Sequence, residues 1–183
     1  MDFKKLLEMD ARWSESMRVA EKPGLLRTVS MVFAHSGDSW FWGLGLILLY
    51  FLTSNPLWKQ WAVTQFVWIA ILAVVVMTTK FIVRRRRPEG EWGAIYRNTD
   101  PHSFPSGHAA RAFLIAVIAV GLGPTWLAIV LCLWAPLVAL ARAAMGVHFL
   151  SDVVAGAVLG ILVGFLALWL NPEVMAFIQA WLT

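Results

Sequence analysis

The sequence predicts an all-α protein, a polytopic bundle of about five transmembrane helices preceded by short N-terminal helices. Hydrophobic residues make up 60% of the 183 residues and charged residues only 14%, and the mean hydropathy is +0.70, which is more apolar than a soluble domain. The apolar residues are gathered in runs that suit membrane helices. Most of the 11 tryptophans lie near the ends of these runs, as aromatic residues do at membrane interfaces.

The N-terminal segment differs from the rest of the chain. Residues 2–22 alternate charged and apolar side chains, which is typical of an amphipathic helix lying along the lipid headgroups; a frayed tail is the alternative interpretation. Pro23–Gly24 ends this segment. The run Leu25–Ala34 is shorter than the about 20 residues that a span needs and contains Arg27. We expect a second helix there, shallow or partly inserted.

Five apolar runs follow this N-terminal segment. We therefore divide the chain into a region of interfacial helices, residues 1–34, and a transmembrane catalytic domain, residues 35–183. The last run is expected to stop at Asn171–Pro172 and to leave a short amphipathic tail. The five predicted spans are Trp40–Thr53, Trp61–Thr79, Pro105–Leu122, Trp126–Leu140 and Val153–Leu170.

Four residues at or inside these runs carry individual predictions. Ser106 is placed to be the N-cap of the helix that follows it, and Asp38 either caps the first span or supports the functional site. Cys132 lies inside an apolar run, so we expect a buried structural thiol, and a single cysteine cannot form an intrachain disulfide. Arg111 either extends to the interface or contacts a lipid headgroup.

Three polar islands interrupt the apolar sequence. Ionisable residues are costly beside a membrane helix and therefore indicate a functional site. Because successive spans cross in opposite directions, the end of one span and the start of the next lie on the same side of the membrane. Five spans would gather all three islands at one mouth of the bundle. The islands are Lys80–Pro88, Pro105–His108 and Ala141–Asp152, with Lys80, Arg87, Ser106, His108, Arg142, His148 and Asp152 as their candidate functional residues.

The residue types at this mouth favour phosphoryl transfer. Lys80, Arg87 and Arg142 can neutralise the charge on phosphate oxygens, and arginine can bind two oxygens at once. The backbone amides of Ser106–His108, at the start of a helix, add donors and a favourable dipole.

A nucleophile is available beside these cations. His148 and Asp152 are four residues apart, so on one helix face the carboxylate can reach one ring nitrogen and leave the other free to attack. The sequence has no dense carboxylate cluster of the kind that holds Mg²⁺ beside phosphates, so we expect no metal and no other cofactor. Asp100 and His102 form a conceivable metal pair, although a plain loop is the preferred interpretation. Arg84–Arg86 are expected to bind lipid phosphates or to set the topology.

Together the three islands resemble the type 2 phosphatidic acid phosphatase (PAP2) superfamily. That family's signature, Lys-x6-Arg-Pro, Pro-Ser-Gly-His and Ser-Arg-x5-His-x3-Asp, is matched in order and spacing within residues 37–170, except that Ala141 replaces Ser. The missing hydroxyl is worth about 1 kcal/mol, so we expect activity to survive. The resemblance implies that His148 is a nucleophile forming a phosphohistidine, that Asp152 stabilises its charge, and that His108 is the acid. It also implies that Lys80, Arg87, Ser106, Gly107 and Arg142 bind phosphate.

The preferred interpretation is a metal-independent membrane lipid phosphatase acting on a lipid phosphate or diphosphate ester. Phosphatidylglycerophosphate, phosphatidate, undecaprenyl diphosphate and lipid A phosphates all remain open as substrates. A transporter or channel also carries charges within the membrane, but here they lie at one face and the span interiors lack a polar path. A non-catalytic scaffold is disfavoured because His148 and His108 are both present.

The charge distribution bears on partners and location. The formal net charge is +4, and the basic residues lie beside apolar spans, so anionic lipid headgroups rather than nucleic acid are the expected partner. We expect a multi-pass protein of the cell (inner) membrane with no obligate protein partner. The resemblance implies a site on the extracytoplasmic face, although Lys80 and Arg84–Arg87 place positive charge there, against the positive-inside tendency.

Overall fold

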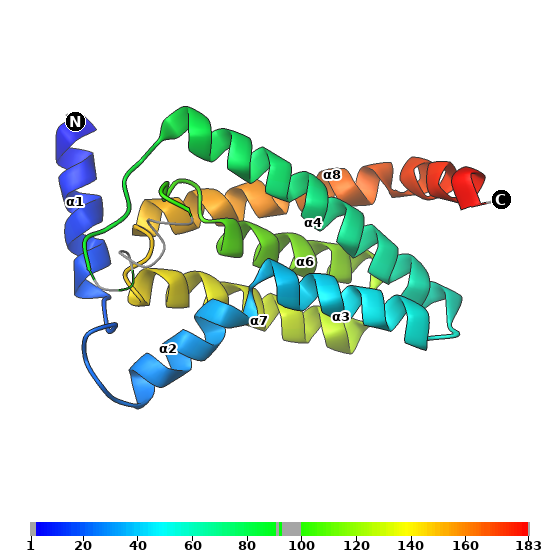
Figure 1. Cartoon of the computed structure of the whole chain (residues 1–183), viewed down its shortest axis with the longest axis horizontal. Coiled ribbons are helices and arrows are strands. Elements are labelled where there is room, and N and C mark those ends of the chain that lie inside the picture. The colour runs from blue at the N-terminus through cyan, green and yellow to red at the C-terminus, as the bar shows by residue number, and fades with distance from the viewer. Residues whose placement is uncertain (1–2, 91, 93–99, 183) are drawn as a thin grey trace.

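The structure, a computed structural model, describes residues 3–90, 92 and 100–182. Within these residues every regular element is a helix, as predicted. Figure 1 shows the long helices running side by side along the molecule, with α1 lying across one end of the bundle. The elements are α1 (Phe3–Ser16), α2 (Leu25–Ser36), α3 (Ser39–Leu52), α4 (Pro56–Val83), α6 (Gly107–Leu122), α7 (Thr125–Ala144) and α8 (Leu150–Leu182).

The five predicted spans correspond to α3, α4, α6, α7 and α8, but the helices differ in length. Within the part of the chain that the structure describes, three segments are long and apolar enough to cross a membrane: Pro56–Val83, Thr125–Ala144 and Leu150–Val174. Helices α3 and α6 have 14 and 16 residues, so at a rise of about 1.5 Å per residue they are shorter than a hydrocarbon core of about 30 Å. The multi-pass helical architecture is confirmed, and five full spans stay a prediction.

Helix α6 is the centre of the bundle and packs most closely against α8. The buried residues Ala109, Ala110 and Ala112 give α6 a narrow surface. A Cβ atom at Gly156 or Gly160 of α8 would overlap the carbonyl oxygen of Ser106 or Ala110. Small residues at such positions let two helix backbones approach closely. This contact brings the start of α6 against the start of α8, where the third polar island lies.

The last apolar run was expected to stop at Asn171–Pro172. Helix α8 instead continues past these residues to Leu182. Asn171 is buried, and its Oδ1 accepts a hydrogen bond of 3.0 Å from Thr64 Oγ1 of α4. The proline removes one backbone donor, yet packing against neighbouring helices lets a membrane helix continue through such a residue. The predicted end was therefore wrong because a tertiary contact outweighs the local signal.

The expectation that Cys132 is buried was also wrong, since its side chain is exposed. Its neighbours Leu131 and Ala135 on α7 are buried while Leu133 is exposed. In a membrane helix the lipid-facing side is as apolar as the packed side. Hydropathy alone therefore does not show which face of α7 is covered.

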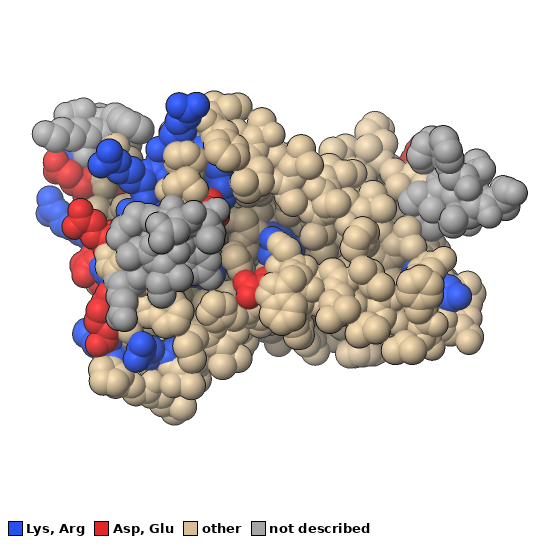
Figure 2. All heavy atoms as spheres, in the orientation of Figure 1, with Lys and Arg blue, Asp and Glu red and all other residues tan. Residues whose placement is uncertain are grey.

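The N-terminal region is packed onto the bundle. Ala20 and Ala34 are buried in one cluster with Met145 and Val147, which follow α7. Helix α2 continues to Ser36, so the predicted boundary after residue 34 falls inside a helix. On the face shown in Figure 2, charged side chains gather at the end of the molecule where α1 lies, and the body of the bundle is largely uncharged.

Candidate active site

The predicted site residues come from several helix ends and meet at the end of the bundle that α1 covers. Lys80 lies in the last turn of α4, Arg142 in the last turn of α7 and Asp152 in the first turn of α8. Lys80, Gly107, His108 and His148 line one cavity of about 310 Å³, and Arg87, Ser106, Arg142 and Asp152 are buried close by.

His148 lies in the short turn between α7 and α8. Gly146 has a φ of +64°, in the left-handed region that favours glycine, and allows this reversal. The His148 side chain is 1% exposed. Its Nε2 atom lies 3.3 Å from Nη1 of Arg87, and its Nδ1 atom lies 3.8 Å from Oδ2 of Asp152. One ring nitrogen thus faces a phosphate-binding candidate and the other faces a carboxylate.

Charge and burial keep the His148 ring neutral. Burial lowers the pKa of His148 well below its ordinary value, and the neighbouring cations Arg142, Arg87 and Lys80 lower it further. A neutral imidazole retains a lone pair on one nitrogen. The ring is therefore in the form that can attack phosphorus.

Asp100 joins two of the predicted phosphate-binding residues, a contact that the sequence did not predict, since Asp100 was considered there only as part of a conceivable metal pair or a plain loop. One oxygen, Oδ2, accepts hydrogen bonds from Lys80 Nζ and from Arg87 Nη2, the latter at 2.7 Å. Lys80 also donates to the carbonyl oxygen of His102 at 2.9 Å, and Arg87 donates to the carbonyl of Val147 at 2.8 Å. The carboxylate thus lies where the two cations can share one anionic oxygen, as they would share a phosphate oxygen.

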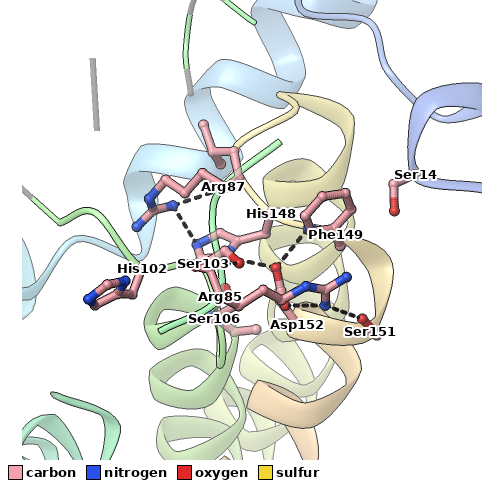
Figure 3. A network of polar contacts seen from close by, with 12 residues as sticks. Ser14, Arg85, Arg87, His102, Ser103, Ser106, His148, Phe149, Ser151 and Asp152 are labelled. Atoms are coloured by element: carbon pink, nitrogen blue, oxygen red, sulfur yellow. Dashed lines mark hydrogen bonds and ion pairs between the residues drawn. The ribbon is translucent and has the colours of Figure 1, made fainter. Parts of the chain in front are cut away.

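Asp152 is held by a network that Figure 3 shows from close by. Its Oδ1 accepts from Arg85 Nη1 at 2.7 Å and its Oδ2 accepts from the backbone N–H of Phe149 at 2.9 Å, while the Ser103 hydroxyl also donates to it. Arg85 was expected to bind lipid phosphates or to set topology; its side chain is 19% exposed, and its guanidinium pairs with carboxylates of the protein. Its second nitrogen lies 2.7 Å from Asp10 of α1, a residue 75 positions away that no short-range pattern could identify.

Ser106 caps α6, as predicted. Its Oγ accepts a hydrogen bond from the Ala109 backbone N–H at 3.5 Å, and its own N–H donates to the Asp152 carbonyl at 2.9 Å. The next residue, Gly107, borders the cavity and faces Val76 of α4. The start of α6 therefore presents its backbone at the cavity wall, close to the first turn of α8.

His108 contacts the turn between α2 and α3. Its Nε2 lies 2.6 Å from Asp38 Oδ1. Asp38 therefore does not cap α3 with its side chain, and its carboxylate contacts a predicted site residue instead. Burial raises the pKa of the Asp38 carboxyl, but its hydrogen bond with His108 and the charges of His108 and His35 outweigh burial and lower it to about 2. Arg111 is 9% exposed, donates to the Gly37 carbonyl and borders the same cavity as His108. It therefore does not extend outward to the interface, and its contact with a headgroup stays a prediction.

Arg142 and its neighbour Ala141 are both buried. Arg142 donates to the carbonyl of Ala34 at 3.4 Å, and its charge acts on both His108 and His148. Ala141 packs in the apolar cluster that contains Ala34. At the position of the usual serine, this chain therefore has a methyl group in contact with the α2 region.

The cavity continues away from the charged residues along one face of α4. Its lining there is apolar and recurs at three- and four-residue intervals, the spacing of one helix face. Ser39 of α3 also borders it. The apolar lining residues are Ile69, Leu72, Ala73, Val76 and Met77.

The comparisons with known proteins agree with this geometry. The PAP2 superfamily model matches residues 61–176. Decaprenylphosphoryl-5-phosphoribose phosphatase of Mycobacterium tuberculosis is 33% identical over 150 residues, which are 80% of each chain. Lipid A 1-phosphatase of Porphyromonas gingivalis is 31% identical over 117 residues, 62% of this chain, and the match spans only 24% of that longer protein.

A solved structure gives the same result for the fold. The transmembrane PAP2-type phosphatidylglycerolphosphate phosphatase from Bacillus subtilis superposes with a TM-score of 0.69 at 25% sequence identity, over 92% of this chain and 87% of that chain. Sequence motifs, family match and fold therefore agree, and the chain belongs to the PAP2 superfamily of membrane phosphatases.

Proposed function

We propose that the protein is a metal-independent lipid phosphatase that removes a terminal phosphate through a phosphohistidine on His148. One observation carries the proposal. The buried His148 has Nε2 3.3 Å from Arg87, in a cavity that Lys80 and His108 also line and that then continues as an apolar groove along α4. A charged headgroup and an apolar chain could occupy the two parts of this cavity together.

The reaction would proceed in two displacements. Phosphate oxygens bind Lys80, Arg87 and Arg142 and the amides at the start of α6, and the phosphate replaces the Asp100 carboxylate on the first two. His148 attacks phosphorus, the phosphorus–oxygen bond to the lipid breaks, and His108 donates a proton to the leaving oxygen.

In the second displacement His108 takes a proton from water, and the resulting nucleophile attacks the phosphohistidine. Inorganic phosphate leaves and His148 returns to its neutral form. Asp152 stabilises the positive charge that His148 carries while it is phosphorylated. The three cations supply the electrostatic stabilisation of the transferring group, so the proposal includes no metal ion.

The relatives support lipid phosphates as the substrate class. The names of these proteins refer to decaprenylphosphoryl-5-phosphoribose, lipid A and phosphatidylglycerolphosphate, which share a phosphate ester and long apolar chains. The groove along α4 would hold such a chain by apolar contact. We place the protein in the cell (inner) membrane with its site on the extracytoplasmic face, as the sequence resemblance implies.

This proposal is tested by measuring the phosphate that the purified protein releases from lipid substrates in mixed micelles. The substrates are phosphatidylglycerophosphate, phosphatidate, undecaprenyl diphosphate and lipid A, and His148→Ala is the inactive control. We expect at least one lipid to release phosphate, and a ³²P-labelled substrate to leave acid-labile, base-stable label on wild type and none on His148→Ala. Absence of release from all four lipids, or full activity of His148→Ala, would overturn the proposal.

A further inference from the structure

The turn between α2 and α3 lies against the first turn of α6. It contains Gly37 and Asp38, which precede the residues matched by the family model, 61–176, and belong to none of the three signature motifs. Asp38 Oδ1 is 2.6 Å from His108 Nε2, and Asp38 Oδ2 is 3.4 Å from His35 Nδ1. The side chains of Asp38 and His108 are 21% and 17% exposed. This is a partly shielded carboxylate–imidazole pair at the edge of the cavity.

The backbone of this turn is anchored from several directions. Arg111 donates to the Gly37 carbonyl, and a Cβ atom at Gly37 would lie 3.0 Å from Val138 and 3.4 Å from the His108 ring. The indole N–H groups of Trp42 and Trp134 donate to the backbone carbonyl and the hydroxyl of Ser36 at 3.0 and 2.9 Å. Asp38 is therefore presented to His108 by a well-held turn rather than by a loose loop.

The charges around His108 explain why a carboxylate is useful there. Burial lowers the pKa of His108 well below its ordinary value, and the charges of Arg142 of α7 and Arg111 of α6 lower it further. Asp38 opposes these effects, because its hydrogen bond and its charge favour the protonated ring. Among the described residues, the other titratable or charged groups near this region are His35 beside Asp38 and, lining the cavity, Lys80, Asp100 and His148.

We infer that Asp38 is the positioning residue of the general acid. It orients the His108 ring through Nε2, which leaves Nδ1 for the leaving oxygen, and its charge favours the protonated ring over the neutral one. This inference rests on the proposed function. It assigns to the α2–α3 turn a role in leaving-group departure, separate from the Asp152 carboxylate, which acts on His148.

A leaving-group comparison tests the inference. The measured quantity is kcat/KM for one lipid phosphate, whose alkoxide departs poorly, and for p-nitrophenyl phosphate, whose phenolate departs without help. The value of kcat/KM depends only on the steps up to the phosphorylation of His148, so the later hydrolysis of the phosphohistidine does not affect it. General acid catalysis is worth about 10²- to 10⁴-fold, and we expect Asp38→Asn to lose about 10- to 100-fold on the lipid and less than about 3-fold on the aryl ester.

Two further readouts separate positioning from a merely structural role. The basic limb of the pH profile on the lipid should move to lower pH in Asp38→Asn, because the ring has lost the charge that retains its proton. In a His108→Ala background, Asp38→Asn should cause no further loss on either substrate, as expected when two residues act as a unit. The matched control is Glu173→Gln, an exposed carboxylate on α8, which should behave as wild type.

Equal loss on the two esters, additive loss in the His108→Ala background, or wild-type activity of Asp38→Asn on the lipid overturns the positioning role. If Asp38→Asn cannot be purified folded, Asp38→Glu replaces it, because this variant keeps the carboxylate but shifts it by one methylene. Its kcat/KM must then fall more on the lipid phosphate than on p-nitrophenyl phosphate. A wild-type protein that releases phosphate from no lipid would instead overturn the proposed function itself.

Discussion

Arg85 Nη1 lies 2.7 Å from Asp152 Oδ1, and the other terminal nitrogen of Arg85 lies 2.7 Å from Asp10. The same Asp10 accepts from the Ser151 backbone N–H at 3.0 Å, and Ser14 Oγ accepts from the Leu150 N–H at 2.8 Å. These amides lie in the first turn of α8, where backbone N–H groups have no hydrogen-bond acceptor within the helix. Helix α1 thus caps α8 from outside and holds Arg85 against the carboxylate beside His148.

The first prediction concerns this link between α1 and the site. Asp10→Asn should lower kcat/KM by about 10-fold, because a charge-assisted hydrogen bond worth about 1.5–3 kcal/mol no longer orients Arg85 and, through it, Asp152. The loss should be equal for a lipid phosphate and for p-nitrophenyl phosphate, since Asp152 acts on the nucleophile and not on the leaving group. Phosphate release from both substrates is the measurement.

Glu8→Gln is the control for Asp10→Asn. Glu8 lies on the same helix, and its carboxylate, with 51% of the side chain exposed, pairs with Arg12 at 4.0 Å, so its replacement should leave activity unchanged. If Asp10→Asn retained full activity, or if Glu8→Gln lost as much, α1 would have no specific connection to the site.

The second prediction follows from the low pKa of His148. Below an ordinary histidine pKa of about 6.5 the unfolded chain binds a proton at this position, and the folded protein does not. The free energy of unfolding should therefore fall as the pH decreases from about 6.5 towards the folded pKa of His148, and this contribution should be constant above about 6.5. His148→Gln should remove this contribution.

Two measurements check this second prediction. Nitrogen-15 NMR of labelled histidines, assigned with His148→Gln, should show the His148 ring titrating below about 6.5. Thermal unfolding between pH 5 and pH 8 should be less dependent on pH in the variant than in wild type. A His148 ring that titrates at or above the ordinary value would contradict the neutral nucleophile.

The third prediction concerns metal ions and a transition-state analogue. Lys80, Arg87 and Arg142 supply the positive charge around the phosphate, so phosphate release should continue in excess EDTA. Vanadate should inhibit, because its trigonal bipyramidal adduct on His148 resembles the transition state. Vanadate binding, followed directly by calorimetry, should weaken strongly in His148→Ala. A strict requirement for Mg²⁺ would place the chemistry in another mechanistic class.

Much of the architecture could be predicted from local sequence. Apolar runs and the turns between them identified helices α3, α4, α6, α7 and α8, because a membrane helix must be continuously apolar. The alternation of those helices predicted that Lys80, His108 and Arg142 belong to one end of the bundle, where the structure brings them together. Ser106 as the cap of α6 followed from its position just before an apolar helix.

The tertiary structure decided which residues surround this site. Asp10 reaches Arg85 and Asp38 reaches His108 across 75 and 70 positions of the chain, so no spacing rule connects either pair. The exposure of Cys132 and the continuation of α8 past Pro172 also depended on packing. Apolar composition indicates that a helix can enter a membrane, but lipid and protein neighbours are equally apolar. Only the packed bundle distinguishes the covered face of a helix and brings distant polar groups into contact.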